Sequence, residues 1–346
     1  MSRLSRLGDG LAEPLLVSNP VNVRYLTGLE SSNAFLVVEP GGETALYADF
    51  RYLEAAREVA GVTVIETRRD VVGELAEQLA GRRIGVEAGH LTVVRRETLR
   101  GGGVDVVGTA GVVERLRAVK DADELDALQR AAALSDRVFE ELARERFTGR
   151  TERELAWHVD RRFRELGAVG AAFETIVAAA GNGARPHTRP SELVIPPGTL
   201  VTVDAGCVVD GYRSDCTRTF ATGELPDDLA QAYQLCLRAQ LDGLAAVRPG
   251  AHGRDVDAVS RVAIAEAGLA GAYGHGLGHG VGLDVHEAPV LRPESTDVLE
   301  VGNVVTVEPG LYLPSVGGCR IEDLVVVAGE GCERLTTCTK DLIHVS

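Results

Sequence analysis

The feature that most constrains the fold is an internal repeat of one glycine-bounded β-strand. Residues 195–206 read IPPGTLVTVDAG, and residues 299–310 read LEVGNVVTVEPG. The two copies share five of twelve residues at an offset of 104, and Asp204 aligns with Glu308. Chance similarity of two strands is the alternative, but the acid-for-acid match makes it the weaker one. The repeat predicts two related halves about a pseudo-twofold axis, each with a carboxylate at the same structural position.

Each copy of the repeat is followed by a turn and a further acidic residue. Asp210-Gly211 is a hairpin signal. A two-residue turn there would return Asp215 to the same face as Asp204, directly opposite or diagonally adjacent. In the second half, Glu308 and Glu322 flank another turn and form a second pair. A single acid is usually a solvated strand end, but these four lie beside nearly continuous apolar runs. Carboxylates this close repel unless a cation or a shared proton intervenes.

Between the two halves lies a glycine-histidine segment, residues 274–287, which reads GHGLGHGVGLDVHE and holds three of the eight histidines. His275 and His279 have the spacing of a helical zinc-protease motif. However, five glycines would each cost about 1 kcal/mol in a helix interior. We therefore expect an extended or looped chain with room around the imidazoles. One histidine alone would most simply be a core residue, but three beside two acidic pairs favour a functional site.

Charge balance favours a pair of metal ions. Four carboxylates carry four negative charges, which two divalent cations would neutralise. Oxygen-rich ligation with one imidazole suits Mn²⁺ or Co²⁺, with Fe²⁺ and Zn²⁺ as alternatives. Two metals that share a hydroxide at neutral pH and polarise a carbonyl form the machinery of many hydrolases. The residues therefore predict hydrolysis of an amide bond.

The rest of the chain predicts two domains. Residues 1–115 alternate short apolar strands with helical stretches, which indicates a small α/β domain with a mixed sheet covered by helices. Residues 116–346 combine amphipathic helices with glycine-punctuated strands and are expected to form an α+β domain. Two capping boxes mark helix starts in this second domain: Asp121 with Glu124, and Thr151 with Glu154.

Composition limits the class of partner and the compartment. The chain of 346 residues has 51 acidic and 36 basic residues, and this net charge of −15 argues against nucleic-acid binding. No apolar run approaches the roughly 20 residues of a membrane span, and the first twenty residues lack the apolar core of a secretory signal. Six cysteines without CxxC spacing are expected to be reduced and partly buried. We therefore expect a cytoplasmic protein that binds neither membrane nor nucleic acid.

The motifs together resemble the pita-bread metallopeptidases, which include methionine aminopeptidase, Xaa-Pro aminopeptidase and Xaa-Pro dipeptidase (prolidase). The resemblance rests on the spacing D-x₁₀-D … H … E-x₁₃-E and on HGxGHGxGLxVHE and TVEPG, and it is strong over 120–346. NVRYLTG at 22–28 and ADFRY at 48–52 are more weakly similar to the creatinase-type N-terminal domain. This extra domain and the VHE at 285–287 favour the proline-specific branch. The implied fold is α+β, with a creatinase-like domain at 1–115 and a pseudo-twofold pita-bread catalytic domain at 116–346.

The resemblance also implies the metal ligands and one catalytic role among them. The implied ligands are Asp204, Asp215, His279, Glu308 and Glu322. Asp204 would chelate one metal and Glu308 would contact the other, while Asp215 and Glu322 would bridge the two. Glu308 would also act as general acid and base on the bridging water.

Four further residues have implied roles around the substrate. His286 would hydrogen-bond the scissile carbonyl and the developing oxyanion. His187 would complete the catalytic set with His286 and Glu308 by lining the pocket near the leaving proline; from local sequence alone, a plain loop histidine is an equally good interpretation. His275 would close the proline pocket, and Arg320 would order Glu322 or contact substrate.

The implied activity is metal-dependent hydrolysis of the Xaa-Pro bond at the N-terminus of dipeptides or short peptides, through a hydroxide that bridges two divalent metals. The enzyme would be an Xaa-Pro dipeptidase or an Xaa-Pro aminopeptidase that acts on proline-containing peptides and forms a homodimer. Some dipeptidases of this branch carry an arginine four residues after the VHE histidine, where this chain has Val290, with Arg292 two residues on. We therefore expect peptides longer than two residues to be accepted as well.

Two alternative functions belong to other classes. One is a metal-free creatinase-like C–N hydrolase on the same fold, and the other is a peptide-binding homologue that has lost catalysis. The five retained ligands count against both.

Overall fold

The computed structural model describes residues 2–345. The chain divides into two compact units that meet in sequence between Arg117 and Ala118. Each unit encloses its own hydrophobic core and is described by itself. In the described part of the chain, no helix is long and apolar enough to cross a lipid bilayer.

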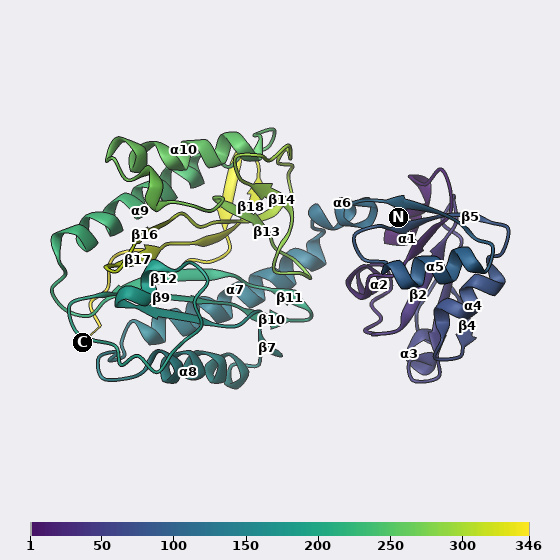
Figure 1. The fold of residues 1–346 in the computed structure, drawn as a ribbon, viewed down its shortest axis with the longest axis horizontal. Coiled ribbons are helices and arrows are strands. Elements are labelled where there is room, and N and C mark those ends of the chain that lie inside the picture. Colours follow the sequence, from purple (N-terminus) through teal and green to yellow (C-terminus); the bar gives the residue numbers. More distant parts are fainter. Residues whose placement is uncertain (1, 346) are drawn as a thin grey trace. The chain divides into compact units, whose positions relative to one another are not determined.

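The first unit is one six-stranded sheet with helices packed against it (Figure 1). The strand order is β4-β3-β2-β1-β5-β6, in which β3–β4, β1–β5 and β5–β6 are parallel pairs and the other two are antiparallel. The strands are β1 Leu15–Val17, β2 Ala34–Val38, β3 Thr44–Asp49, β4 Thr63–Thr67, β5 Arg83–Glu87 and β6 Asp105–Thr109. The helices are α1 Arg3–Asp9, α2 Pro20–Thr27, α3 Leu53–Arg57, α4 Val71–Gln78, α5 Val93–Gly101 and α6 Val112–Ala118.

The mixed sheet covered by helices confirms the interpretation of this half of the sequence. Sequence reasoning assigned neither β1 nor the helices α1, α2, α5 and α6, and for β1 and α5 the reason is identifiable. β1 has only three residues, which is too short to show a periodic pattern. Helix α5 buries only Leu99, so its apolar face is too narrow to recognise.

The second unit is built from two antiparallel sheets, each with its own pair of helices (Figure 1). The first sheet has the order β12-β9-β8 and packs on α7 and α8. The second has the order β14-β13-β15-β18-β19 and packs on α9 and α10. The helices are α7 Ala122–Leu142, α8 Glu152–Glu165, α9 Asp227–Ala246 and α10 Gly253–Glu266, with short 3₁₀ turns at Ala180–Ala184 and Ala270–Ala272. Two sheets with two helix pairs give the pseudo-twofold α+β architecture that the repeat predicts.

The strands of this unit place the repeated segments at the centre of each sheet. Strands β9 and β15, which carry the two copies of the repeat, each pair on both sides. The strands are β7 Gly170–Ala171, β8 Ile176–Ala179, β9 Leu200–Ala205, β10 Cys207–Val209, β11 Tyr212–Arg213, β12 Cys216–Ala221, β13 Gly278–Gly280, β14 Glu287–Leu291, β15 Val304–Val307, β16 Gly310–Leu313, β17 Gly317–Arg320, β18 Asp323–Ala328 and β19 Gly331–Arg334. Small sheets β11-β10-β7 and β16-β17 extend the two hairpins.

Both predicted capping boxes are present and begin the helices expected from them. Asp121 accepts from the backbone N–H of Glu124, whose side chain accepts from the N–H of Asp121, and α7 follows. Thr151 and Glu154 make the same reciprocal pair at the start of α8. Local side-chain chemistry therefore fixes where these two helices begin.

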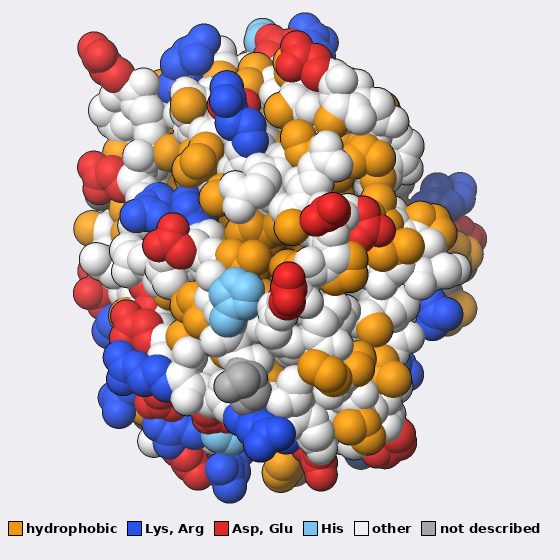
Figure 2. Space-filling view, turned by 90° about the vertical axis from the view of Figure 1, so that its left-hand side faces the viewer, with side chains coloured by type: hydrophobic (Ala, Val, Ile, Leu, Met, Phe, Trp, Pro, Cys, Tyr) orange, Lys and Arg blue, Asp and Glu red, His pale blue; other side chains and the backbone are white. Residues whose placement is uncertain are grey.

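The surface and the cysteines agree with the composition. Figure 2 shows one face of the molecule, where basic side chains lie among acidic and apolar ones rather than forming a continuous basic surface. All six cysteines are free thiols, five of them buried and Cys332 partly exposed. The burial agrees with the expectation, and the reduced state stays a prediction.

Candidate active site

A cavity of about 770 Å³ in the second unit brings the sequence motifs together. Its walls include eight of the nine site residues expected from the sequence: His187, Asp204, Asp215, His275, His279, His286, Glu308 and Arg320. The ninth, Glu322, lies behind this wall and is 1 % exposed. Phe173, Ile176, Val285 and Val290 supply an apolar part of the same cavity.

The strand register explains how the acids meet. Thr217 pairs directly with Asp204 across β9 and β12, so Asp215 lies diagonally from Asp204 rather than opposite it. In the second half, Val307 pairs with Asp323, and the same register places Glu308 directly opposite Glu322. Each hairpin therefore carries a pair of carboxylates, but the pair is diagonal in the first hairpin and directly opposed in the second. The sequence alignment alone did not reveal this difference.

Glycines allow the backbones behind the site to approach closely. A Cβ atom on Gly206 would lie 1.9 Å from the carbonyl oxygen of Ser214, between Asp204 and Asp215 along the hairpin. A Cβ atom on Gly278 would lie 2.0 Å from the carbonyl oxygen of Thr306. The glycine-histidine segment is a loop that leads into strand β13, as expected, and close backbone approach is the reason for its composition.

Three carboxylates form one cluster in which mutual repulsion and burial disfavour three simultaneous negative charges. One oxygen from each of Asp204, Asp215 and Glu322 lies within 4.8 Å of the others. Burial raises the pKa of Asp215 and of Glu322 well above the usual range, and the neighbouring carboxylates raise both further. Burial also raises the pKa of Asp204, against the opposing charge of Arg320. Such a cluster holds either protons or cations at neutral pH.

His279 places an imidazole nitrogen beside these acids. Its Nε2 lies 3.1 Å from Glu308 Oε1 and 3.8 Å from Asp215 Oδ2. Its Nδ1 lies 3.1 Å from the carbonyl oxygen of Gly280, which accepts a hydrogen bond from Nδ1–H and leaves Nε2 facing the acids. Burial lowers the pKa of His279, but the hydrogen bond and charge of Glu308 outweigh it and raise that pKa. Burial raises the pKa of Glu308, yet His279 outweighs it and brings that pKa to about 2. Without a metal, the two therefore form an ion pair.

Arg320 was expected to order Glu322 or to contact substrate. It lines the cavity, where a substrate contact stays a prediction. Its Nη2 donates to Asp204 Oδ2 at 2.6 Å, and its Nε donates to Thr217 Oγ1 at 3.2 Å. Thr217 Oγ1 in turn donates to Glu322 Oε2 at 2.7 Å. Arg320 thus acts directly on Asp204 and reaches Glu322 only through Thr217, because the register places Thr217 between them.

The remaining histidines lie around the cavity. His275 Nε2 lies 2.9 Å from the hydroxyl of Tyr312, and the oxygen of this hydroxyl accepts a hydrogen bond from Arg320 Nη1 at 2.9 Å. The ring of His286 packs edge-on against that of His279, with centroids 4.3 Å apart. Burial lowers the pKa of both His275 and His286, so both are neutral at neutral pH. His187 is exposed on the wall of the same cavity.

Several supporting residues escaped sequence reasoning. Thr217 holds Glu322, and Thr306 Oγ1 donates to Glu308 Oε1 at 3.1 Å. Tyr312 connects His275 with Arg320. The sequence could have predicted the contact of Thr306. In each VTV repeat the threonine precedes the acid by two residues, so both side chains lie on the same face of the strand. Nothing in the local sequence marks Tyr312.

A buried ion pair anchors the segment that carries His286. Lys120 Nζ lies 2.7 Å from Glu287 Oε1, and their side chains are 0 % and 6 % exposed. Glu287 follows His286 directly, whereas Lys120 precedes α7, 167 residues away in sequence. The pair fixes the backbone next to a cavity-facing histidine.

The donor set fits divalent metal ions. Asp204 Oδ1 is buried and has no hydrogen-bond partner among the described residues, although it belongs to the three-carboxylate cluster. An unpaired buried carboxylate oxygen is costly, and a cation would satisfy it. Oxygen ligands with one imidazole match the preferences of Mn²⁺ and similar ions better than those of thiolate-bound metals.

Comparison with known proteins agrees with this geometry. Residues 126–329 match the family described as Metallopeptidase family M24, and residues 5–119 match the Creatinase/Prolidase N-terminal domain. The chain is 37 % identical over 335 residues to an uncharacterized peptidase, YqhT, of Bacillus subtilis, and the match covers 95 % of each chain.

Two solved structures extend the comparison to the whole fold. An Xaa-Pro dipeptidase from Bacillus anthracis superposes with a TM-score of 0.95 at 35 % identity, covering 99 % of both chains. An X-Pro aminopeptidase from Thermotoga maritima superposes with a TM-score of 0.87 at 30 % identity, covering 96 % of this chain and 97 % of the other. Proteins with these two names thus share one architecture with this chain.

Proposed function

The chain belongs to metallopeptidase family M24 and carries a creatinase/prolidase N-terminal domain, and from this premise we propose that it hydrolyses the Xaa-Pro bond at the N-terminus of dipeptides and short peptides with two divalent metal ions. The observation that carries the proposal is the buried acidic cluster opposite His279. Its unpaired oxygen on Asp204 and its raised carboxyl pKa values leave a site that a cation would complete. Relatives named Xaa-Pro dipeptidase and X-Pro aminopeptidase support the substrate class.

The proposed ligands are Asp204, Asp215, His279, Glu308 and Glu322. Ions held there supply the Lewis acidity that activates a water molecule and polarises the scissile carbonyl. We propose Mn²⁺ or Co²⁺, because four carboxylates outnumber the single imidazole. Neither alternative, the metal-free creatinase-like hydrolase or the inactive binding homologue, requires a buried cluster of carboxylates.

The proton transfers would be carried by residues of this chain. His279 must be neutral to offer Nε2 as a ligand, and a neutral His279 removes the charge that lowers the pKa of Glu308. Glu308 would accept the proton of the attacking water and return it to the leaving nitrogen. Neutral His286 can donate one ring N–H to the developing oxyanion.

The substrate would lie along the apolar side of the cavity. Phe173, Ile176 and Val285 can pack against a proline ring, with His275 and His187 at its edges. Val290 offers no charge to a C-terminal carboxylate, whereas the exposed Arg292 on the same wall does. We propose that this allows both dipeptides and longer peptides with proline second.

A substrate panel with controlled metal content tests the proposal. Ala-Pro, Ala-Pro-Ala and Ala-Ala are incubated with chelated protein, then with Mn²⁺ or Co²⁺. We expect cleavage of the first two substrates only, and only with metal. Cleavage that survives complete metal removal would overturn the two-metal proposal, and metal-bound protein that cleaves no Xaa-Pro peptide would favour the binding homologue.

We also propose that the enzyme is a cytoplasmic homodimer, on the basis of the family resemblance. Light scattering after size-exclusion chromatography should then give about twice the chain mass of 36.7 kDa. A mass of one chain would contradict the dimer, and recovery from a secreted or membrane fraction would contradict the compartment.

A further inference from the structure

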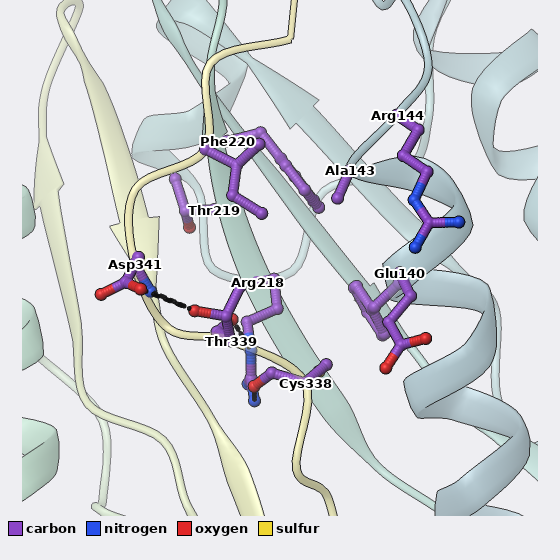
Figure 3. A pocket seen from close by; sticks show the side chains of 11 residues that line it. Glu140, Ala143, Arg144, Arg218, Thr219, Phe220, Cys338, Thr339 and Asp341 are labelled. Carbon is purple, nitrogen blue, oxygen red and sulfur yellow. Dashed lines mark hydrogen bonds between the residues drawn. The ribbon is translucent and has the colours of Figure 1, made fainter.

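A second cavity lies in the catalytic unit, apart from the metal site, where the C-terminal segment crosses strand β12 (Figure 3). Its volume is about 360 Å³. Phe139, Glu140, Ala143 and Arg144 from α7 and the turn after it form one wall, and Arg218, Thr219 and Phe220 from β12 lie across from them. Cys338, Thr339, Asp341 and Ile343 of the C-terminal segment complete it. Glu140, Arg144 and Asp341 are exposed, so this cavity opens to solvent.

Cys338 is the nucleophile that faces this cavity, and a second thiol lies behind it. The sulfur atoms of Cys338 and Cys216 are 3.9 Å apart, although the residues are 122 positions apart in sequence. Cys338 is 5 % exposed and Cys216 is 0 % exposed. A small reagent in the cavity therefore meets Cys338 first.

The cavity gives a small neutral oxidant access to Cys338. The guanidinium of Arg218 lies on the same wall, donates from Nη2 to the carbonyl oxygen of Cys338 at 2.8 Å and pairs with Asp323 at 2.7 Å. Hydrogen peroxide is small and uncharged, so the mixed charges at the mouth do not exclude it.

We propose that Cys216 and Cys338 are a peroxide-oxidisable thiol pair, reached through this second cavity, and that closing their disulfide weakens the adjacent metal site. The Cys338 thiolate attacks one oxygen of hydrogen peroxide and breaks the O–O bond. The products are Cys338 sulfenic acid and hydroxide. The sulfur of Cys216 then displaces the sulfenic oxygen, its proton is taken up by the departing oxygen, and the S–S bond forms. In sum, two thiols lose two electrons and two protons, and one peroxide becomes two waters.

Closure would act on the metal site because Cys216 directly follows Asp215. The sulfurs must approach from 3.9 Å to about 2.05 Å. The backbone of Cys338 is held on both sides, by Asp136, which accepts from its N–H at 2.9 Å, and by Arg218. Part of the movement therefore falls on Cys216, whose sulfur also contacts the carbonyl oxygen of Glu322 at 3.9 Å. This consequence rests on the proposed function, since Asp215 and Glu322 are among the residues proposed to hold the metal ions.

The other buried thiols provide an internal comparison. Cys236 and Cys319 also lie close together, with Cys236 Sγ 4.0 Å from the carbonyl oxygen of Cys319, but both are 0 % exposed. Neither lines a described cavity. Access, rather than mere proximity of two sulfurs, thus distinguishes the proposed pair.

The experiment reads the disulfide directly. Folded full-length protein is exposed to hydrogen peroxide, then denatured, alkylated and digested with trypsin. We expect a cross-link between peptides Ser214–Arg218 and Leu335–Lys340 that dithiothreitol reverses. The variant Cys338→Ala should lose this cross-link, whereas Cys332→Ala, which removes a partly exposed thiol elsewhere, should keep it.

The second readout is Mn²⁺ affinity by calorimetry. Peroxide should weaken binding at least about tenfold in the wild type and in Cys332→Ala, and not in Cys338→Ala, by analogy with loss of groups that support ligands. Full alkylation of both peptides after peroxide, or a Cys236–Cys319 disulfide in their place, would overturn the thiol proposal. A cross-link with unchanged Mn²⁺ affinity would overturn the coupling. Reduced protein that binds no Mn²⁺ would instead overturn the proposed function. The thiol proposal would still be testable, because the cross-link is detected without metal.

Discussion

Replacing Thr217 by valine should weaken metal binding although none of the proposed ligands is replaced. The side chains have the same shape, but the variant loses the 2.7 Å bond from Thr217 Oγ1 to Glu322 Oε2, together with the 3.2 Å bond that Thr217 Oγ1 accepts from Arg320 Nε. Both residues are buried, at 0 % and 1 % exposed, so water does not replace the hydroxyl.

The size of the effect follows from the protonation state of Glu322. Its raised pKa makes it neutral in the metal-free protein, where the lost bond costs about 0.5–1.5 kcal/mol. As a metal ligand it is ionised, and a bond to a charged group is worth about 1.5–3 kcal/mol. The difference of about 1–1.5 kcal/mol corresponds to roughly 5- to 13-fold weaker Mn²⁺ binding.

Calorimetric titration of chelated protein with Mn²⁺ measures this directly. The matched control is Thr202→Val, which removes a buried hydroxyl on strand β9 whose partner is the hydroxyl of Thr219 at 3.1 Å. We expect the control to bind Mn²⁺ as the wild type does. A cooperatively folded Thr217→Val variant within twofold of the wild type, or a control that loses as much, would refute the reasoning.

Three further predictions concern pH, the buried ion pair and substrate length. Asp215 and Glu322 have raised pKa values in the folded protein, so the metal-free protein should lose stability as pH rises above the ordinary carboxyl range. Mn²⁺ should therefore raise the melting temperature more at pH 8 than at pH 5, and a pH-independent increment would contradict this. Lys120→Met should lower the free energy of unfolding by about 3–5 kcal/mol, because it removes the 2.7 Å ion pair from the buried carboxylate of Glu287. Urea unfolding should show more than half of that loss recovered when Glu287→Gln is added, and no recovery would argue against charge as the cause. Arg292→Ala should raise KM for Ala-Pro by up to about fivefold, the range of an exposed charge contact. KM for amidated Ala-Pro-Ala should not change. Equal effects on both substrates would exclude Arg292 as a contact of the substrate carboxylate.

Local sequence patterns predicted the elements that depend on neighbouring residues. The capping boxes at Asp121 and Thr151 begin α7 and α8 because each involves a side chain and a backbone group three residues apart. The glycine-histidine segment was recognised as non-helical for an equally local reason, the cost of glycine in a helix. Helix α5 was missed because its single buried residue leaves no pattern to detect.

The acids and histidines of the candidate site were identified from the sequence, but their partners were not. A repeat shows that two strands carry equivalent acids, and it does not show which side chain stands across from each. The register places Thr217 opposite Asp204 and directs Arg320 to Asp204 rather than to Glu322. A shift of one pair would change these contacts, because side chains alternate between faces.

The sequence by itself determined the α+β class, the repeated halves and the set of titratable residues, since these follow from composition, spacing and period. Tertiary structure alone decided which groups share the buried cluster, which carboxylate oxygen is left unpaired, and that Cys216 meets Cys338 across 122 residues of chain. The physical reason is that charge repulsion, desolvation and thiol reactivity depend on distances of a few ångströms. Those distances are set by strand register and packing between segments far apart in the chain.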